Sequence, residues 1–395
     1  MDLTAQSILT LNAGSSSLRF AVFDADCARV LEGKFERIGR PGARLALNDG
    51  EPARDLPLAT HADCLPEIFE LLEAKGIGVP AVIAHRVVHG GPEHFDSTAI
   101  TPVLLEKLRA ITSFAPNHLP AALSLMEAAG KRWKGVPQIA CFDTAFHRDL
   151  PVAARLLPLP RRYAAEGVRR YGFHGLAFSS VLAELQHRTG GRVPSRVILA
   201  HLGHGASLAA LRNGRCVDTT MGFTPLGGLV MSTRTGDLDP GVLAFMAARE
   251  KLSPAALERV VSAESGLIGL SETSSDTREL LEREGSDVRA AEALAVFVHQ
   301  ARKAIGACTA VLGGLDAIVF SGGIGENSVV LRGRLCAHFE YLDILLDPAL
   351  NMANAPIISV ADSRVTIHVI NADEESTLAT EARSFRASPR FHPAA

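Results

Sequence analysis

The chain of 395 residues has only six cysteines, and none of them forms a C-x-x-C pair. Cysteines this widely spaced argue against a zinc finger, a redox dithiol and a disulfide framework. No apolar run approaches the roughly 18 residues that a membrane span needs. The first residues carry neither the basic region nor the small-residue cleavage site of a secretion signal. We therefore expect a cytoplasmic protein with no membrane partner.

The chain also lacks a large excess of charge of either sign. The chain has 40 Lys and Arg against 43 Asp and Glu, which gives a formal net charge of −3 at pH 7. This balance provides no positive field for nucleic acid, so we expect none as a partner. A hydrophobic content of 47% with 21% charged residues is ordinary globular composition. At about 150 residues per domain, the length predicts two or three domains.

The segment from Val217 to Gly241 stands out by its small residues. After Asp218 no charged side chain occurs until Arg234, and two aspartates follow. Its Gly, Pro, Ser and Thr residues predict a loop that offers backbone N–H groups and hydroxyls. Such a loop suits an anion, and a guanidinium grips phosphate or carboxylate. On this segment alone, a solvated linker remains the alternative.

Apolar strands alternate with amphipathic helices, which predicts an α/β fold. Strands are expected at 8–11, 18–23, 79–88, 138–141, 197–199, 208–211, 317–320 and 365–370. Helices are expected at 65–74, 103–113, 120–129, 176–188, 242–249, 255–261 and 288–312. Residues 39–60 are expected to form an exposed excursion, and residues 265–271 a loop. The runs ILTLNAGSSSLRF and VILAHLGHGASLA, half a chain apart, share a strand–small loop–strand pattern that predicts a duplicated domain.

The strand at 317–320 runs directly into a glycine-rich loop and a helix. Backbone N–H groups at such a helix start suit a phosphate. The match to a dinucleotide fingerprint is poor because Ser328 replaces the third glycine, and no G-x-x-x-x-G-K-[ST] motif occurs. What remains is a nucleotide held by several small-residue loops.

Several charged residues fall at predicted strand ends. Arg86 lies within an apolar strand, where an internal salt bridge and an anion site both fit. Asp143 follows the carboxyl end of a strand, a common place for functional groups in α/β folds. Each histidine by itself is typically structural. Together with Arg86, Asp143 and Arg234, the histidines at 118, 174, 201 and 204 supply the parts of a phosphoryl-transfer site.

The sequence has no His or Cys motif with the spacing of zinc ligands, but it does have hard oxygen donors for another metal. Asp143, Glu374 and Glu375 suit Mg²⁺ that a nucleotide carries.

Nine motifs run nearly end to end: NAGSSSLRF, HRVVHGG, FDTAFH, RRYGFHG, HLGHGAS, DTTMGFTPLGGLVMSTRTGDLDP, SGLIGLSETSSDTRE, FSGGIGENS and ADEES. In this order they resemble the acetate and propionate kinase family of the sugar kinase, Hsp70 and actin superfamily. The resemblance implies an α/β fold of two duplicated actin-like (ribonuclease H-like) domains, whose mixed β-sheets flank a central cleft. It implies an N-terminal domain of residues 1–146 plus 378–395, a C-terminal domain of residues 147–377 with the nucleotide loops, and a homodimer.

The activity that the resemblance implies is phosphoryl transfer from ATP to acetate, giving ADP and acetyl phosphate. Mg²⁺ is the expected metal, with Mn²⁺ as an alternative. A kinase for another short carboxylate, such as propionate or butyrate, remains an alternative. So does a non-catalytic nucleotide-binding regulator, although such a protein has no need of the intact charged set.

The family's motifs also imply site residues in this chain. The catalytic residues would be Arg86, His118, Asp143, His174 and Arg234. The metal would be held by Asn12 and Glu374. The acyl substrate would contact Arg86, Val88, Asn117, Phe173 and Pro225. The nucleotide would contact Ser15, Ser17, His201, Leu202, Gly203, His204, Gly205, Asp276, Thr277, Arg278, Gly322, Gly323, Ile324, Gly325, Glu326 and Asn327.

This chain departs from the family pattern at a few positions. His204 replaces an Asn in a nucleotide loop, and Gly227 replaces a Glu. The run Leu176-Ala-Phe178 stands in place of Thr-Ser-His. Asn117 occupies an expected apolar pocket position, and an unpaired amide against a methyl group is costly, so acyl-chain preference could differ. No departure removes a charged group that the family assigns to catalysis.

Overall fold

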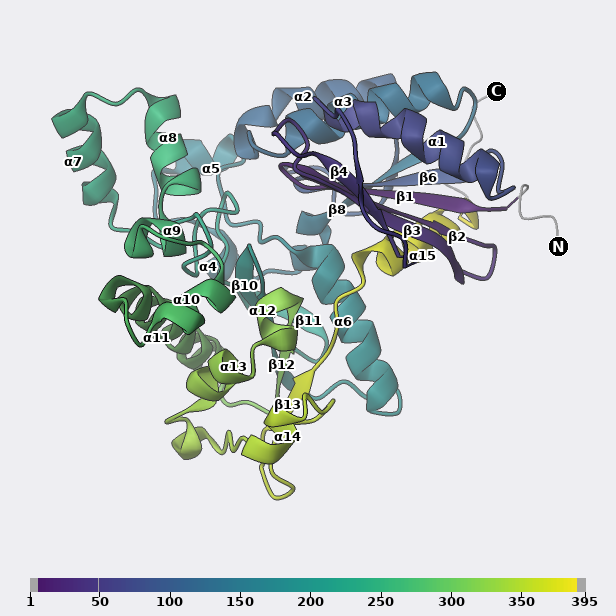
Figure 1. The fold of residues 1–395 in the computed structure, drawn as a ribbon. Helices are drawn as coiled ribbons and strands as arrows, with labels where there is room; N and C mark the ends of the chain where they lie inside the picture. Colours follow the sequence, from purple (N-terminus) through teal and green to yellow (C-terminus); the bar gives the residue numbers. More distant parts are fainter. Residues whose placement is uncertain (1–5, 49, 389–395) are drawn as a thin grey trace. The chain divides into compact units, whose positions relative to one another are not determined.

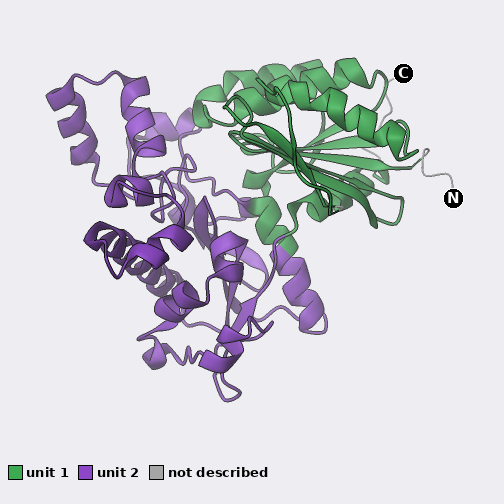
Figure 2. Ribbon diagram, viewed as in Figure 1, with its two compact units in different colours: residues 1–146, 175–180, 373–395 green, residues 147–174, 181–372 purple. Residues whose placement is uncertain are grey.

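The computed structural model describes residues 6–48 and 50–388. The chain forms two compact units, shown in green and purple in Figure 2. Unit 1 comprises residues 1–146, 175–180 and 373–395, and unit 2 comprises residues 147–174 and 181–372. Within the described ranges, no helix has both the length and the apolar character that a membrane crossing requires.

Unit 1 is built on an eight-stranded mixed sheet (Figure 1). Its strands are β1 (Ile8–Ala13), β2 (Ser17–Phe23), β3 (Arg29–Glu36), β4 (Arg44–Leu47), β5 (Arg54–Asp55), β6 (Val82–Val87), β7 (Thr98–Ala99) and β8 (Gln138–Phe142). They lie in the order β5-β4-β3-β2-β1-β6-β8-β7. β1 runs parallel to β6, and β6 parallel to β8, whereas the other pairs are antiparallel.

The two faces of this sheet are covered by different helices. Leu9 and Leu11 of β1 share a buried cluster with α1 (Cys64–Ala74) and α3 (Leu119–Arg132). Ile8 lies in the other cluster, with α15 (Glu374–Arg386). This is the two-residue period of a strand that is buried on both faces.

Residues 39–60 are mostly exposed, as expected, but they do not form an irregular excursion. The segment contains β4 and β5, which extend the sheet edge. Leu45 is 3% exposed because it packs into the same cluster as Leu9 and Leu11. Its polar neighbours obscured the strand, since an edge strand buries only part of its side chains.

Unit 2 is built on a five-stranded mixed sheet. Its strands are β9 (Arg196–Leu202), β10 (Ala206–Arg212), β11 (Arg215–Thr219), β12 (Ala317–Ser321) and β13 (Thr366–Val369), in the order β11-β10-β9-β12-β13. The first three strands pair antiparallel, and β9, β12 and β13 run parallel. The strands β3-β2-β1-β6-β8 of unit 1 have the same order and directions. The predicted duplication is therefore confirmed at the level of the sheets.

The helices not yet named complete the two units. They are α2 (Pro102–Ala110), α4 (Val152–Arg155), α5 (Arg161–Ala165), α6 (Gly175–Arg188), α7 (Pro240–Glu250), α8 (Pro254–Ala263), α9 (Gly266–Ser271), α10 (Thr277–Arg283), α11 (Val288–Leu312), α12 (Gly322–Asn327), α13 (Val329–Cys336) and α14 (Pro348–Met352). α11 begins and ends where the sequence predicts. The Asp287 side chain caps its first turn, and Gly313 adopts the left-handed conformation after its last residue.

The expectation of a loop at residues 265–271 is wrong, because α9 occupies most of them. Leu267 of α9 is fully buried and joins Leu294 and Phe297 of α11 in one cluster. Packing against a long neighbouring helix stabilises a segment that is too short and too glycine-rich to be helical alone.

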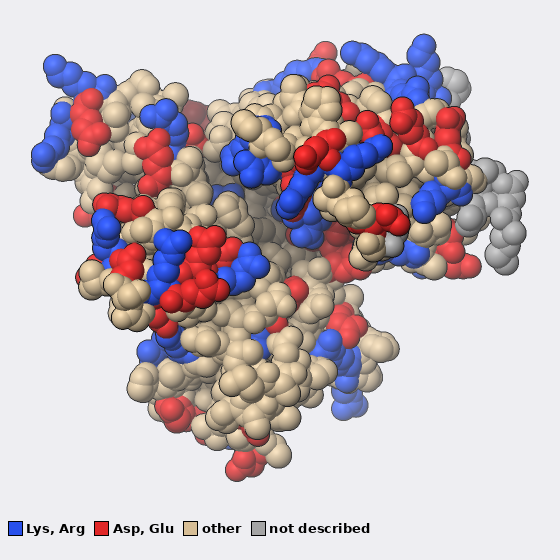
Figure 3. All heavy atoms as spheres, in the orientation of Figure 1, with Lys and Arg blue, Asp and Glu red and all other residues tan. Residues whose placement is uncertain are grey.

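Charged side chains of both signs are interspersed on the face shown in Figure 3, with uncharged surface between them. This agrees with the small net charge of the chain.

Candidate active site

Three neighbouring strand ends of unit 1 carry polar side chains. Asn12 lies near the end of β1, Arg86 near the end of β6, and Asp143 directly after β8. β1, β6 and β8 run in the same direction, so their carboxyl ends meet at one edge of the sheet. Glu374 and Glu375 begin α15, which packs on the same strands. We call these five residues the Arg86 cluster.

Arg86 is the centre of this cluster. Its Nε and NH2 groups both donate to Oδ2 of Asp143, at 3.0 and 2.7 Å. Its NH1 group donates to Oδ1 of Asn12 at 3.1 Å and lies 3.2 Å from Oε2 of Glu374. The amide nitrogen of Asn12 donates to Glu374 at 2.9 Å and to Glu375 at 3.0 Å. The internal salt bridge expected of Arg86 is therefore present, whereas the anion site stays a prediction.

Burial and charge oppose each other inside the cluster. Burial alone would lower the pKa of Arg86, but the Asp143 and Glu374 carboxylates raise it overall. Burial raises the pKa of the Asp143 carboxyl, and Arg86 counteracts that rise. Burial, followed by the Glu374 charge, raises the pKa of Glu375. Three carboxyl groups around one guanidinium are an acidic excess that favours a further cation.

The chemistry of this cluster fits a hard divalent cation. Asn12 and Glu374 offer an amide oxygen and a carboxylate, which are the donors that Mg²⁺ prefers. Within residues 6–48 and 50–388, no three or more His, Cys, Asp or Glu side chains are grouped so that they could hold a metal by themselves. Mg²⁺ is commonly held by one or two protein groups together with substrate phosphates, and this cluster offers such a partial set.

The remaining predicted residues of unit 1 lie around the same strands. Ser15 is exposed and Ser17 half-buried, in the β1–β2 hairpin that follows Asn12. Val88 directly follows β6 and is buried. His118 is half-buried at the start of α3, next to the exposed Asn117.

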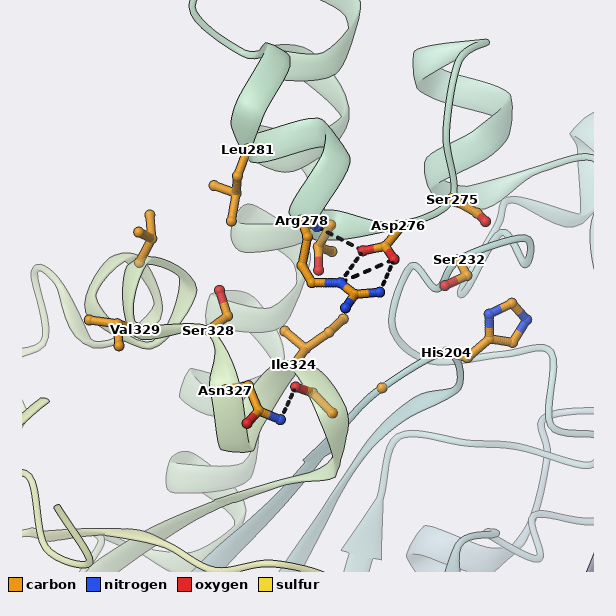
Figure 4. Close-up of a pocket in the computed structure, with 14 residues that line it drawn as sticks. His204, Ser232, Ser275, Asp276, Arg278, Leu281, Ile324, Asn327, Ser328 and Val329 are labelled. Carbon is orange, nitrogen blue, oxygen red and sulfur yellow. Dashed lines mark hydrogen bonds and ion pairs between the residues drawn. The ribbon is translucent and has the colours of Figure 1, made fainter. Parts of the chain in front are cut away.

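Unit 2 contains a cavity of about 720 Å³ (Figure 4). Its predicted lining residues are Gly203, His204, Asp276, Thr277, Arg278, Gly323, Ile324 and Asn327. Sequence reasoning missed the lining residues Ser232, Ser275, Leu281, Ser328, Val329 and Val330. Leu281 follows Arg278 by nearly one helical turn, so the 3.6-residue period of α10 is the signal that could have identified it. The loops around β9, α10 and α12 thus meet at one pocket, as predicted.

Other residues predicted to contact the nucleotide do not line this pocket. Leu202, Gly322 and Gly325 are buried and are not among its lining residues. The Glu326 carboxylate accepts the backbone N–H groups of Gly322, at 2.8 Å, and Ala372, at 3.1 Å. Its role in this structure is to fix the start of α12.

An ion pair lies in this pocket, drawn with dashed lines in Figure 4. The Asp276 side chain caps α10 by accepting the Arg278 N–H at 2.9 Å. The Arg278 guanidinium also donates to it, at 2.6 Å, which lowers the pKa of Asp276. The Arg278 side chain is 84% exposed, so it contributes little to stability and can reorient toward a ligand.

A second group of unit 2 residues forms what we call the His174 corner: His174, Gly205, Ser207 and Arg234. A methyl group added at Gly205 would lie 2.9 Å from Nε2 of His174 and 3.5 Å from NH1 of Arg234. The imidazole and the guanidinium therefore converge on one point, which stays accessible because residue 205 has no side chain. Nδ1 of His174 lies 2.9 Å from the Ser207 hydroxyl, and the His201 ring is 4.8 Å away.

The glycine-rich segment 217–241 is a loop for most of its length, as predicted. Arg234 NH1 donates to the Pro225 carbonyl at 3.2 Å within this loop. Gly266 has φ +65°, and a methyl group there would lie 2.2 Å from the Met231 carbonyl oxygen, so only glycine allows this approach. The Asp237 side chain accepts the Gly228 N–H at 2.7 Å. These bonds hold the loop in shape although Gly227 has replaced the family's Glu.

Phe173 is buried, and its carbonyl oxygen lies 2.9 Å from Nε2 of His147. Burial lowers the pKa of His147 to about 4, so this ring is a neutral structural histidine. Phe173 directly precedes His174 and fixes the chain where the His174 corner begins.

Comparison with known proteins places these features in a family. A sequence model described as the Acetokinase family matches residues 7–380. The acetate kinase of Dictyoglomus thermophilum is 39% identical over 389 residues, covering 95% of this chain and 98% of that protein. The propionate kinase of Edwardsiella piscicida is 44% identical over 385 residues, covering 95% of each. The crystal structure of Porphyromonas gingivalis acetate kinase superposes with a TM-score of 0.86 at 34% identity, covering 96% of this chain and 99% of that one.

Proposed function

The chain belongs to the acetokinase family, and we propose that it transfers the terminal phosphoryl group of ATP to the carboxylate of acetate, giving acetyl phosphate and ADP. Two observations, one in each unit, support this proposal. The Arg86 cluster offers hard oxygen donors and a guanidinium. The pocket of unit 2 has the size of a small-molecule site, and Gly203 and Gly323 of the glycine-rich loops line it.

The proposed mechanism is a direct in-line displacement. A carboxylate oxygen of acetate forms a bond to the γ-phosphorus while the bond to the β-phosphate oxygen breaks, and ADP leaves. Acetate is already an anion at neutral pH, so the reaction needs no general base. Asp143 is bound to Arg86 at 2.7 Å, and its proposed role is to orient that guanidinium.

Arg86, Arg234 and Nε2 of His174 neutralise charge that develops on the oxygens of the transferring phosphoryl group. His118 is retained as a proposed catalytic residue on the family resemblance. A divalent metal bound by Asn12 and Glu374, for which we propose Mg²⁺ with Mn²⁺ as an alternative, would supply additional positive charge to the phosphates.

The nucleotide is proposed to bind in the pocket of unit 2. The acyl group is proposed to contact Val88, Asn117, Phe173 and Pro225. Propionate remains the second candidate substrate, because a relative named propionate kinase is 44% identical to this chain.

A hydroxamate assay tests the reaction and its acyl preference together. It would use acetate, propionate and butyrate as acceptors, with ATP or pyrophosphate as donor. We expect acetyl hydroxamate to form with ATP, and only when a divalent metal is present. If none of the three acids gave a hydroxamate with either donor, the proposed function would be overturned in favour of a nucleotide-binding regulator.

Arg234→Ala connects this activity to the site. Loss of a guanidinium that acts on the phosphoryl group should lower turnover by about 100-fold or more, with modest loss of ATP affinity. Turnover close to that of the unsubstituted protein would contradict the role of Arg234. Isothermal titration with ATP measures the affinity separately from the chemistry.

Three further assignments stay proposals: domains of residues 1–146 plus 378–395 and 147–377, a cytoplasmic location, and a homodimer. We propose α7 and α8 as the dimer surface, because neither helix has a buried residue and Phe245 on α7 is 59% exposed. Sedimentation equilibrium would show a dimer that Phe245→Asp weakens; a monomer at all concentrations would exclude it.

A further inference from the structure

Nδ1 of His174 faces a buried serine hydroxyl, as Nδ1 of the neighbouring His201 also does, at 3.3 Å from Ser321. Nδ1 lies 2.9 Å from the hydroxyl of Ser207, whose residue is fully buried in β10. His174 itself has φ 58°, a left-handed conformation that costs energy in a non-glycine residue. The backbone and the serine together fix the ring so that Nε2 points toward Gly205 and Arg234.

A hydroxyl is the one common partner that both donates and accepts a hydrogen bond. When the imidazole is neutral, the Ser207 hydroxyl can donate to Nδ1, and the ring proton then resides on Nε2. When the imidazole is charged, Nδ1–H donates to the Ser207 oxygen, and Nε2 still carries a proton. With the hydroxyl in this orientation, Nε2 can therefore donate a hydrogen bond in both protonation states.

Other partners at Nδ1 would give a different result. A backbone carbonyl only accepts, so it would hold the proton on Nδ1 and leave Nε2 of the neutral ring with a lone pair. That lone pair would repel a phosphoryl oxygen. His147 shows such a pairing in this chain, because its Nε2 faces the carbonyl oxygen of Phe173 at 2.9 Å. A carbonyl acceptor fixes the tautomer of a structural histidine, whereas Ser207 meets the different requirement of His174.

We propose that Ser207 is a positioning residue that keeps a proton on Nε2 of His174, so that the ring donates to an oxygen of the transferring phosphoryl group. The second half of this statement rests on the proposed function. His201 and Arg234 also face this ring, and the guanidinium at the same point makes an anionic oxygen the fitting partner of Nε2–H. Ser207 acts through His174 and has no required contact with the substrate.

The test is Ser207→Ala, examined by NMR and by kinetics. Nitrogen-15 shifts of labelled histidine, recorded above the pH at which the ring titrates, report which nitrogen carries the proton. We expect the Nε2–H form in the unsubstituted protein and a mixture with the Nδ1–H form in Ser207→Ala. Turnover should fall about tenfold. The KM for ATP should change less than about twofold, because the hydrogen bond is made mainly in the transition state.

Two further variants separate positioning from structural damage. Ser207→Thr keeps the hydroxyl and should keep the Nε2–H form. Thr309→Val in α11 also removes a buried hydroxyl, one that bonds the Ile305 carbonyl at 2.9 Å, and should change neither tautomer nor turnover.

The proposal is overturned if the neutral ring of the unsubstituted protein carries its proton on Nδ1, or if Ser207→Ala leaves the tautomer unchanged. Absence of acetyl phosphate formation by the unsubstituted protein is a different result. It would overturn the proposed function, while the NMR measurement would still decide what Ser207 does to the ring.

Discussion

The Arg86 cluster of unit 1 and the His174 corner of unit 2 are built by different means. In the Arg86 cluster, opposite charges stabilise one another. The Arg86 guanidinium donates a hydrogen bond to Asp143 at 2.7 Å and lies 3.2 Å from Glu374. In the His174 corner, a missing side chain creates the space, and a hydroxyl orients the imidazole. The Arg86 cluster depends on the compensation of buried charge, whereas the His174 corner depends on open space beside the donors of His174 and Arg234.

This difference separates the effects of substitution. A residue that compensates buried charge supports the fold and the chemistry at once, so removing it damages both. A glycine that only leaves space contributes little to stability where its backbone is in an ordinary conformation. Filling that space should stop the chemistry and leave the fold intact.

The largest effect is expected for Arg86→Ala. It leaves the Asp143 carboxylate, which is 0% exposed, without its main partner. Removing one member of a buried ion pair costs about 3–5 kcal/mol. Turnover should fall about 1,000-fold as well. Urea unfolding and the hydroxamate assay measure the two losses.

The control for Arg86→Ala is Arg44→Ala. Arg44 pairs with Glu36 at 2.7 Å, but its side chain is 50% exposed. Loss of such a surface pair costs less than about 1 kcal/mol. An Arg86→Ala protein as stable as Arg44→Ala would show that unit 1 does not depend on its buried charge.

Gly205→Ala should have the next largest effect, mainly on activity. The added methyl group would lie 2.9 Å from Nε2 of His174, where a phosphoryl oxygen is proposed to bind. Gly205 is not among the positive-φ residues of the described chain, so alanine fits its backbone. We expect turnover to fall about 100-fold. The loss of unfolding free energy should be smaller than for Arg86→Ala, because only the His174 ring has to shift to admit the methyl group.

Gly306→Ala in α11 provides the matched control. A methyl group there meets nothing within 4 Å. It should leave turnover unchanged and stabilise the helix by about 0.5–1 kcal/mol. If Gly205→Ala instead unfolded the protein at low urea, the proposed distinction between the two sites would be wrong.

The smallest effect concerns one buried histidine in each unit. Burial lowers the pKa of His85 in unit 1 and of His147 in unit 2 to about 4, from an ordinary value of 6.5. As the pH falls below 6.5, these two histidines therefore bind protons in the unfolded chain but stay neutral in the native protein. Their stabilisation is complete above that pH and decreases as the pH falls toward 4.

Lowering the pH from 7.5 to 5 should reduce the unfolding free energy by about 2 kcal/mol for each of these histidines. Urea unfolding across this range measures the slope, and His85→Gln and His147→Gln should each reduce it by a similar amount. Unequal reductions would reveal a difference between the units that the equal pKa values do not predict. A slope unchanged in both variants would contradict the neutral state of these rings.

Much of the fold could be predicted because its signals are local. The period of two in β1 and the caps at Asp287 and Gly313 depend on neighbouring residues only. β4, β5 and α9 could not be predicted in this way, because distant partners stabilise them. Leu45 packs into a cluster that includes side chains of β1, α1 and α3, and Leu267 packs with side chains of α11.

The candidate residues of the site were predictable as residue types, and in part as groups. The pocket collects the loops at 203–204, 276–278 and 323–327, which the family resemblance indicates. Glu326 was expected at the nucleotide, yet its carboxylate bonds Gly322 and Ala372. The direction in which a side chain points depends on which backbone donors the fold brings near it, and the motif does not contain that information.

By itself, the sequence determined the central strands, the long helices and the glycine loops, and which charged residues are available for phosphoryl transfer. Only the tertiary structure decided that Arg86 bonds Asp143 and Asn12, and that Ser207 meets Nδ1 of His174. Backbone preference and hydrophobic period act over a few residues, so a sequence displays them directly. Hydrogen bonds between residues 57, 74 or 33 positions apart depend on strand order and register, which form only when the whole sheet packs.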